Sequence, residues 1–229
     1  MEALERARDE GVRAVLIDLT MPISPGMPFN PDHFPPEITR YAEIDTDGWE
    51  ARKLLLDSHL GTHMDAPSHF VRGGTTLDGI ALEVFVGAAQ VVHLPDLEDG
   101  QEIAPMHLPT LTSSRILLAT GWWRASEDSD RYFQRFPYLG QDAAEVLVGA
   151  GVTLVGIDGP SIDYDGTTHV LLLSSGAVVV ENLVRLDSLP ATCSVSVMPL
   201  PIVGGDGCPV RAIAEAPEAA VGTADRGGS

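Results

Sequence analysis

The chain has 229 residues, a length that suits one domain with a sizeable hydrophobic core. Its 33 acidic residues against 14 basic residues give a formal net charge of −19, which repels nucleic acid and anionic membranes, so we expect neither as a partner. Cys193 and Cys208 are the two cysteines, and they lie outside any C-x-x-C pattern. The composition therefore argues against a disulfide scaffold or a cysteine-based zinc motif, and we expect both cysteines to be reduced.

Residues 1–13 alternate acidic and basic side chains and predict a short surface helix or an extension. They lack the apolar core of a signal peptide, and no stretch approaches 18 consecutive apolar residues, so we expect a cytoplasmic protein. The first strand is expected in AVLIDLT, residues 14–20.

Six prolines in residues 21–36 remove backbone donors and predict a long ordered loop or lid. Its Met27, Phe29 and Phe34 suggest two readings: they line a pocket for an apolar or aromatic substrate, or they pack the loop onto its own domain.

Short apolar runs rich in β-branched residues predict many strands in the remainder of the chain. They lie at 49–58, 84–94, 115–120, 152–158, 176–183 and 193–200.

Between Gly140 and Gly151 the apolar spacing is helical and ends at a glycine suited to a C-cap. We expect a single α/β domain over residues 1–214, with a mixed sheet and few helices. The small, acidic and glycine-rich tail 215–229 is expected to be mobile.

The segment 57–69 gathers three histidines and two aspartates within thirteen positions. His59, His63, Asp65 and His69 are the candidate functional residues, because neutral imidazole and carboxylate are the usual ligands of zinc or manganese in catalytic sites. Each histidine taken alone is more often a locally hydrogen-bonded residue, but the cluster as a whole favours a metal site.

The spacing of these residues requires an irregular backbone. In a flat strand His59 and His63 would stand about 13 Å apart, too far to share one ion. In a helix they would be neighbours, but Asp65 would turn away from His63. A compact turn through Gly61 followed by a short extended step brings both histidines and Asp65 to one side, so we predict this geometry. A hydrolase with a serine or cysteine nucleophile is the weaker alternative, because the chain has no G-x-S-x-G elbow.

The segment HLGTHMDAPSHF resembles the H-x-G-T-H-x-D-A-P-x-H signature of the cyclase family, which includes bacterial kynurenine formamidases, isatin hydrolases and ring-forming enzymes of polyketide pathways. Further segments along nearly the whole chain resemble the same family: IDLTMPISPGMPF, ILLATGWW, LVGIDGPSID, the block from His169 to VVVENL, and GDGCPVRAIA. The opening loop reads SPGMPFNP where kynurenine formamidases typically carry a Trp-Pro-Gly-Asp-like segment, so the substrate stays open.

This resemblance implies the swivelling β/β/α fold, one or two divalent ions per subunit and commonly a homo-oligomer. It implies that His59, His63 and Asp65 hold one ion, and that Asp65, His169 and Glu181 hold a second. His69 would act as the general acid and base. His169 and Glu181 have little functional signal apart from this resemblance.

The expected activity is hydrolysis of an amide or lactam C–N bond in a small aromatic substrate, as in arylformamidases, because a bound divalent ion activates water and polarises a carbonyl. One alternative is a metal-dependent cyclase that closes a polyketide-type ring by removing a proton. Another is a metal-binding protein without catalysis, in which His69 would be dispensable. The sequence does not separate these three.

Overall fold

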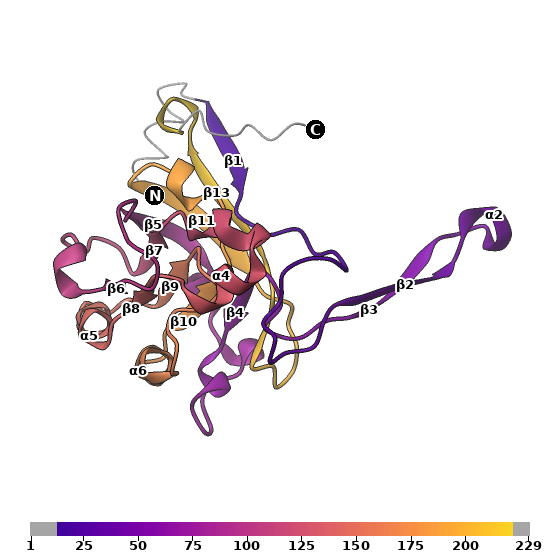
Figure 1. Ribbon diagram of the computed structural model, residues 1–229, viewed down its shortest axis with the longest axis horizontal. Helices are drawn as coiled ribbons and strands as arrows, with labels where there is room; N and C mark the ends of the chain where they lie inside the picture. Colours follow the sequence, from indigo (N-terminus) through magenta and orange to yellow (C-terminus); the bar gives the residue numbers. More distant parts are fainter. Residues whose placement is uncertain (1–12, 222–229) are drawn as a thin grey trace.

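The computed structural model describes residues 13–221, and Figure 1 shows one curled sheet with helices on one side and a long arm projecting from it. Nine strands form the main sheet in the order β1-β13-β11-β5-β7-β9-β10-β4-β12. In chain order their bounds are β1 Ala14–Asp18, β4 His63–Asp65, β5 Val86–His93, β7 Arg115–Ala119, β9 Leu154–Ile157, β10 Val178–Glu181, β11 Thr192–Met198, β12 Gly207–Pro209 and β13 Arg211–Pro217.

The centre of the sheet is parallel and its two flanks are antiparallel. Strands β5, β7, β9 and β10 pair in parallel, whereas β1, β13 and β11 on one side and β4 and β12 on the other pair antiparallel. Strands β7, β9 and β10 are almost entirely buried and are rich in apolar residues, as expected for strands covered on both faces.

Alternate residues of the central strands enter two different cores. Ile116 and Leu118 of β7 pack with the helical side chains Leu147 and Leu172, whereas Leu117 packs with residues of the antiparallel flank. This division follows from the two-residue side-chain period of a strand. The helices are α2 Ile44–Asp47, α3 Leu82–Phe85, α4 Ser129–Gln134, α5 Gln141–Gly149 and α6 Thr167–Ser174.

The predicted helix between Gly140 and Gly151 is confirmed as α5, and Gly151 beyond its end has φ +72°. The predicted strands at 14–20, 84–94, 115–120, 152–158, 176–183 and 193–200 are all present, with ends within a few residues of the expected ones. Residues 21–36 form no helix or strand, as the six prolines predict.

The predicted strand at 49–58 is present, but it lies outside the main sheet. Its residues Ala51–Leu55 form β3, which pairs with β2, Glu37–Ala42, in a separate two-stranded hairpin. A further small sheet joins β6, Glu102–Ile103, to β8, Tyr138–Leu139.

At the C-terminal end, strand β13 continues past the predicted domain boundary at Ala214 and pairs with β1 as far as Pro217. Residues 222–229 of the tail predicted at 215–229, and residues 1–12 of the helix or extension predicted at 1–13, lie outside the described residues. Within residues 13–221, no helix is long and apolar enough to cross a membrane.

Candidate metal centre

The backbone turn at Gly61 sets the geometry of the His-rich segment. Gly61 has φ +58°, a left-handed conformation that glycine adopts without steric cost, and the chain then enters the short strand β4. Because side chains two apart in a strand share a face, His63 and Asp65 point to the same side. The predicted compact turn and extended step are therefore confirmed.

Strand β4 is antiparallel to β10, and its register places His63 directly opposite Glu181. The two side chains are almost fully buried, and Glu181 Oε2 lies 3.4 Å from His63 Nε2. Glu181 Oε1 accepts a hydrogen bond from the backbone N–H of Ile162 at 2.7 Å and lies 3.0 Å from His169 Nε2. Sheet pairing thus brings together residues that are more than 100 positions apart in the sequence.

Asp65 lies at the centre of the cluster and is 1% exposed. Its Oδ1 lies 2.7 Å from His59 Nδ1 and 3.5 Å from His63 Nε2. Its Oδ2 lies 3.5 Å from His169 Nε2 but forms no hydrogen bond. A buried carboxylate oxygen without a hydrogen bond is costly, and a cation bound at this point would compensate it.

Three of the histidines are anchored through the ring nitrogen that faces away from Asp65 and Glu181. His63 Nδ1 lies 2.7 Å from the carbonyl oxygen of Gly61, and His169 Nδ1 lies 2.7 Å from Asp163 Oδ1. The third is His59, whose Nε2 lies 3.0 Å from Asp206 Oδ2.

This arrangement is the usual one for metal-binding histidines, in which an outer hydrogen bond fixes the tautomer and leaves the inner nitrogen free to coordinate. In each of the three rings, the inner nitrogen faces a buried carboxylate. The donor set therefore fits one or two divalent ions of the zinc or manganese type.

Burial and neighbouring charge shift the pKa values of the three anchored histidines in opposite directions. Burial by itself lowers the pKa of His59, but the carboxylates of Asp65 and Asp206 outweigh it and raise the pKa to about 9. Burial acts in the same direction on His63 and His169, yet neighbouring carboxylates raise the pKa of both.

For the pKa values of the two buried carboxylates, the two effects have the opposite signs. Burial raises the pKa of Asp65, and the histidines around it, His63 first, bring it well below its ordinary value. Burial likewise raises the pKa of Glu181, and His169 and His63 lower it overall. The cluster is therefore a focus of buried negative charge that attracts either protons or a metal cation.

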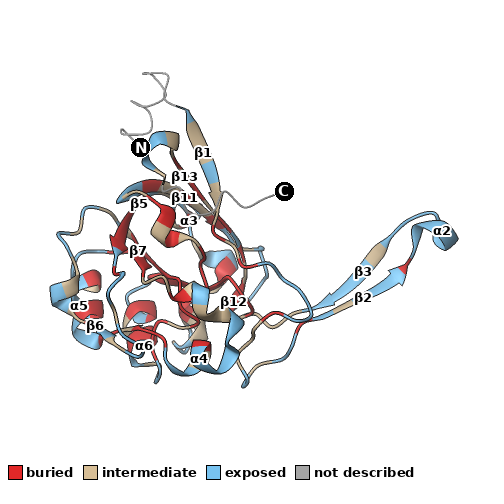
Figure 2. Ribbon diagram, turned by 45° about the horizontal axis from the view of Figure 1, so that its top comes forward, coloured by how far each residue is buried: buried red, intermediate tan, exposed pale blue. Residues whose placement is uncertain are grey.

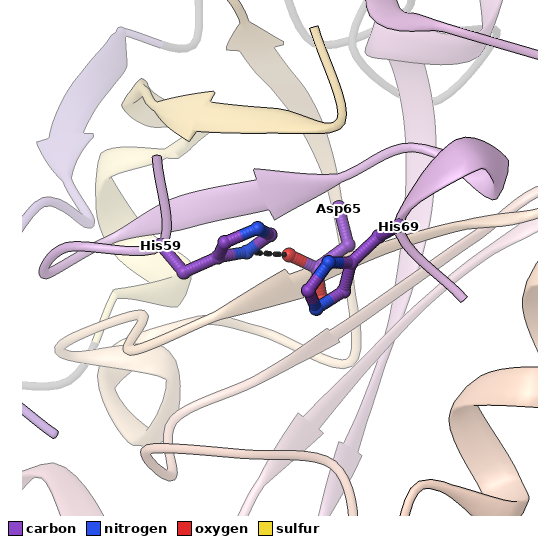
Figure 3. Close-up of side chains that lie close together, drawn as sticks. All are labelled: His59, Asp65 and His69. Atoms are coloured by element: carbon purple, nitrogen blue, oxygen red, sulfur yellow. Dashed lines mark hydrogen bonds and ion pairs between the residues drawn. The ribbon is translucent and has the colours of Figure 1, made fainter. Parts of the chain in front are cut away.

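His69 occupies a different position in the site. It ends a short 3₁₀ turn, Pro67–His69, and its ring stacks on that of His59 with 3.8 Å between the ring centroids. Figure 3 shows the two rings gathered around the Asp65 carboxylate. Burial lowers the pKa of His69, so the ring is neutral near pH 7.

Among residues 13–221, two sets of three candidate ligands lie close enough to hold an ion, each with its ligand atoms within 4.8 Å of one another. One set is His63, Asp65 and Glu181, and the other is His59, Asp65 and His69. The structure thus brings all six predicted residues to one place. The two sets differ from the two ligand sets that the resemblance implies, although Asp65 is shared by both sets in each case. The assignment of metal ligands, and of His69 as the acid–base group, stays a prediction.

A cavity of about 150 Å³ opens onto the cluster. A neighbouring hollow of about 290 Å³ shares six wall residues with it: Asn30, Phe70, Phe133, Pro160, Ser161 and His169. Together the two spaces approach the size of a small-molecule site. Of the three loop residues proposed to line a pocket, Phe29 does so, Met27 packs into the core with Leu60, and Phe34 is exposed.

Comparison with known proteins identifies the family. The Cyclase family model matches residues 17–164, about two thirds of the chain. The chain belongs to the cyclase family. A kynurenine formamidase of Salinibacter ruber is 34% identical over 207 residues, covering 86% of this chain and 96% of that protein.

Solved structures give the same fold. An isatin hydrolase bound to the product analogue thioisatinate superposes with a TM-score of 0.83 at 22% identity and covers 95% of this chain and 97% of its own. A predicted metal-dependent hydrolase from Bacillus stearothermophilus has a TM-score of 0.75 at 29% identity and covers 89% of this chain and 98% of its own. The predicted α/β domain with a mixed sheet and few helices, the swivelling β/β/α fold of the cyclase family, is confirmed.

The cyclase-family match ends before three of the residues that shape the site. His169, Glu181 and Asp206 follow residue 164. The structure nevertheless places Glu181 beside His63, His169 beside Asp65, and Asp206 beside His59. Sequence reasoning missed the two outer carboxylates, Asp163 and Asp206. Both lie in segments quoted above, LVGIDGPSID and GDGCPVRAIA, but nothing local distinguishes them from the other acidic residues.

Proposed function

We propose that this cyclase-family member is a metal-dependent hydrolase that cleaves an amide or lactam C–N bond of a small aromatic substrate, as an arylformamidase does. The observation that carries the proposal is the pair of buried carboxylates, Asp65 and Glu181, each facing two or more anchored imidazoles at the base of a cavity. The kynurenine formamidase relatives and the metal-dependent hydrolase neighbour support the same reaction class.

The ligand assignment is part of this proposal. His59, His63 and Asp65 would hold one zinc or manganese ion, and Asp65, His169 and Glu181 would hold a second when two are bound. A divalent ion at this position supplies a Lewis acid that polarises the substrate carbonyl and makes water more acidic. Asp163 and Asp206 would keep the imidazoles of His169 and His59 in their binding orientation.

His69 is suited to move the proton in this reaction. Its neutral ring borders the cavity, so it can accept a proton from water as the water oxygen attacks the carbonyl carbon. It can then deliver that proton to the nitrogen as the C–N bond breaks, which leaves a carboxylic acid and an amine. His69 Nδ1 lies 3.6 Å from Asp206 Oδ2, which is too far for a hydrogen bond.

The walls of the cavity favour an uncharged aromatic substrate. Phe29, Phe70 and Phe133 supply apolar surface beside the cluster. Among the described residues that line the two neighbouring spaces there is no lysine or arginine, and Asp32 and Asp163 add negative charge. A neutral amide or lactam is therefore better accommodated than an anionic substrate.

The same proposal includes a cytoplasmic location and a homo-oligomer. The two cysteines support the location, because both are free and buried, as is usual in reducing compartments.

The deciding experiment combines metal analysis with a product screen. Purified protein is assayed for zinc and manganese and then incubated with N-formylkynurenine, isatin and simple aryl amides, with a chelated sample and His63→Ala as controls. The proposal expects metal in the native protein, hydrolysis of at least one substrate, and loss of both in the controls. Ring closure with release of water would identify a cyclase instead, and bound metal without turnover of any compound would indicate a binding protein.

A further inference from the structure

Asn182 lines the cavity but has no part in the ligand and acid–base assignments above. It directly follows Glu181 at the end of β10 and has φ +55°, which makes it one of two left-handed residues other than glycine within residues 13–221. In a continuing strand, consecutive side chains would point to opposite faces, and Asn182 would turn away from the metal centre. The left-handed turn ends this alternation, and both side chains line the cavity.

The backbone of Asn182 is held on both sides. Its N–H donates a hydrogen bond to the carbonyl oxygen of Gly159 at 2.8 Å, and its own carbonyl oxygen accepts one from Thr62 Oγ1 at 2.6 Å. Left-handed backbone persists where the surrounding structure fixes it, and such residues cluster at functional sites. The side chain of Asn182 therefore leaves the backbone in a fixed direction.

Tyr132 fixes the orientation of the Asn182 amide. It is the buried residue of α4, a helix that Figure 2 shows at the surface of the body. The Tyr132 hydroxyl donates to Asn182 Oδ1 at 2.8 Å, which is its only hydrogen bond within residues 13–221. Because a buried O–H needs an acceptor, Oδ1 and not Nδ2 must face it. Burial also raises the pKa of Tyr132 well above its ordinary value, so the hydroxyl keeps its proton.

The amide nitrogen of Asn182 is left without a partner. Asn182 is 6% exposed, and its Nδ2 donates no hydrogen bond to any atom of residues 13–221. Since Oδ1 is held by Tyr132, the nitrogen is the polar atom that this side chain offers to the cavity. A buried donor without an acceptor is costly, and a ligand atom that accepts its hydrogen bond would compensate it.

We propose that Asn182 is a catalytic residue whose Nδ2 donates a hydrogen bond to the carbonyl oxygen of the scissile amide or lactam, and that Tyr132 is its positioning residue. This inference rests on the hydrolase activity proposed above. As the water oxygen attacks the carbonyl carbon, the C=O electron pair moves onto the carbonyl oxygen and the water proton passes to His69. The oxygen then carries negative charge near Asp65 and Glu181, and a neutral N–H aimed at it stabilises that charge. As the C–N bond breaks, the electron pair re-forms C=O and His69 delivers the proton to the departing nitrogen.

This contact also determines how the substrate enters. Because Nδ2 is a donor only, it selects a carbonyl oxygen and not an N–H at that point. The aromatic part of the substrate would then lie against Phe70 and Phe133, which line the same cavity. Two other neutral donors of the wall, Asn30 and Ser161, are less buried than Asn182, so the hydrogen bond from Asn182 is better shielded from water.

The first test measures kcat, KM and metal-to-protein ratio, with whichever of N-formylkynurenine, isatin or the aryl amides the native protein hydrolyses. Asn182→Asp keeps the acceptor for Tyr132 and replaces the N–H donor by an oxygen. Asn182→Gly removes the side chain at a backbone conformation that glycine adopts freely. We expect kcat to fall about 10²–10³-fold in both, as for loss of one oxyanion donor. KM and metal content should change little, because the negative charge develops only in the transition state.

The matched control is Gln90→Glu, which also turns a buried amide into a carboxylate. Gln90 lies on β5, and its amide bonds Thr110 and Thr112 outside the cavity. This variant should lose stability, because a carboxylate oxygen would face the carbonyl oxygen of Thr110, yet keep native kcat. A general loss of stability is in this way separated from loss of the donor.

Tyr132→Phe tests the positioning role, since it removes the hydroxyl and keeps the ring. It should lower kcat by less than Asn182→Gly does, and it should have no further effect on kcat when Asn182→Gly is already present. A merely structural role of Tyr132 would lower kcat equally in both backgrounds and would overturn the positioning assignment.

The second test observes the amide directly. Asn30 and Asn182 are the two asparagines of the sequence, so protein labelled with ¹⁵N in the asparagine side chain gives two amide signals, and the one missing from Asn182→Asp belongs to Asn182. The hydrolysed compound is added to chelated protein, which does not turn it over, until binding is saturated. The Asn182 signal should move more than that of Asn30.

The outcomes separate this inference from the hydrolase proposal. Native kcat in both Asn182 variants, or an Asn182 signal that stays in place at saturation, would overturn the inference and leave the hydrolase proposal standing. Metal content that falls in parallel with kcat would overturn it as well, because Asn182 would then support the metal centre and not the substrate. A native protein that hydrolyses none of the compounds would overturn both.

Discussion

Substitution of Gly61 tests whether the backbone turn at this residue is required for the metal centre. Gly61 has φ +58°, and a Cβ added there would stand 2.7 Å from the terminal methyl carbon of Met27, which is itself buried. Replacing this glycine by alanine therefore adds two costs. The left-handed conformation costs about 1–2 kcal/mol for a residue with a Cβ. The Met27 methyl is the far end of a flexible side chain, so moving it aside adds only about 0.5–1.5 kcal/mol, the cost of an off-rotamer side chain.

The control for this substitution is Gly151→Ala. Gly151 has φ +72° in the body of the protein, but a Cβ added there meets nothing within 4 Å. It therefore carries the conformational cost without the collision. Comparing the two variants isolates the effect of crowding between Gly61 and Met27.

Urea unfolding in the presence of a chelator measures the fold alone, and metal titration of each folded variant measures the centre. We expect Gly61→Ala to lose more unfolding free energy than Gly151→Ala, by about 0.5–1.5 kcal/mol, and to bind metal more weakly, whereas Gly151→Ala binds it normally. Gly61→Val should be worse, because a β-branched residue is still less compatible with this conformation. A valine variant with native metal affinity would refute the reasoning about the turn.

Three further predictions concern the side chains of the centre. His69→Ala should keep its metal and fold while turnover falls by about 10²–10⁴-fold, as expected for a positioned acid–base group; loss of metal in parallel with turnover would make His69 a ligand. Asp163→Asn should weaken metal binding about 10–100-fold by releasing His169, as outer-sphere substitutions typically do, and isothermal titration with the apoprotein measures this. In the chelated protein, the raised pKa of His59 stabilises the fold fully below pH 6.5, and this contribution disappears as pH rises through about 9. Thermal unfolding at pH 6.5 and 9.5 should show that loss in the native apoprotein and a smaller one in His59→Gln.

The sequence was sufficient to predict the parts of the site that are determined locally. Gly61 between two histidines, with Asp65 two residues beyond the second, leaves few backbone paths that bring the three side chains together, and the structure follows the predicted one. Helix α5 was likewise predictable, because apolar spacing and a terminal glycine both lie within a dozen residues.

The partners that come from distant segments were not predictable from local pattern. Asp163 and Asp206 are two of 33 acidic residues, and only the folded chain shows that they accept hydrogen bonds from the outer nitrogens of His169 and His59. The arm was missed for a related reason. Residues 49–58 have the composition of a strand, but composition does not say that the strand pairs with β2 outside the main sheet.

The metal centre depends on sheet register more than on its loops. His63 and Asp65 lie on β4 and Glu181 on β10, and the antiparallel pairing sets His63 opposite Glu181 and Asp65 opposite Val179. A shift of one residue would turn every side chain of a strand to the other face, so that Val180 would replace Glu181 beside His63. Such a shift would also bury Glu181 among the apolar side chains that surround Val180 in the native core. The burial that makes these carboxylates attract a cation therefore also enforces the register that brings them together.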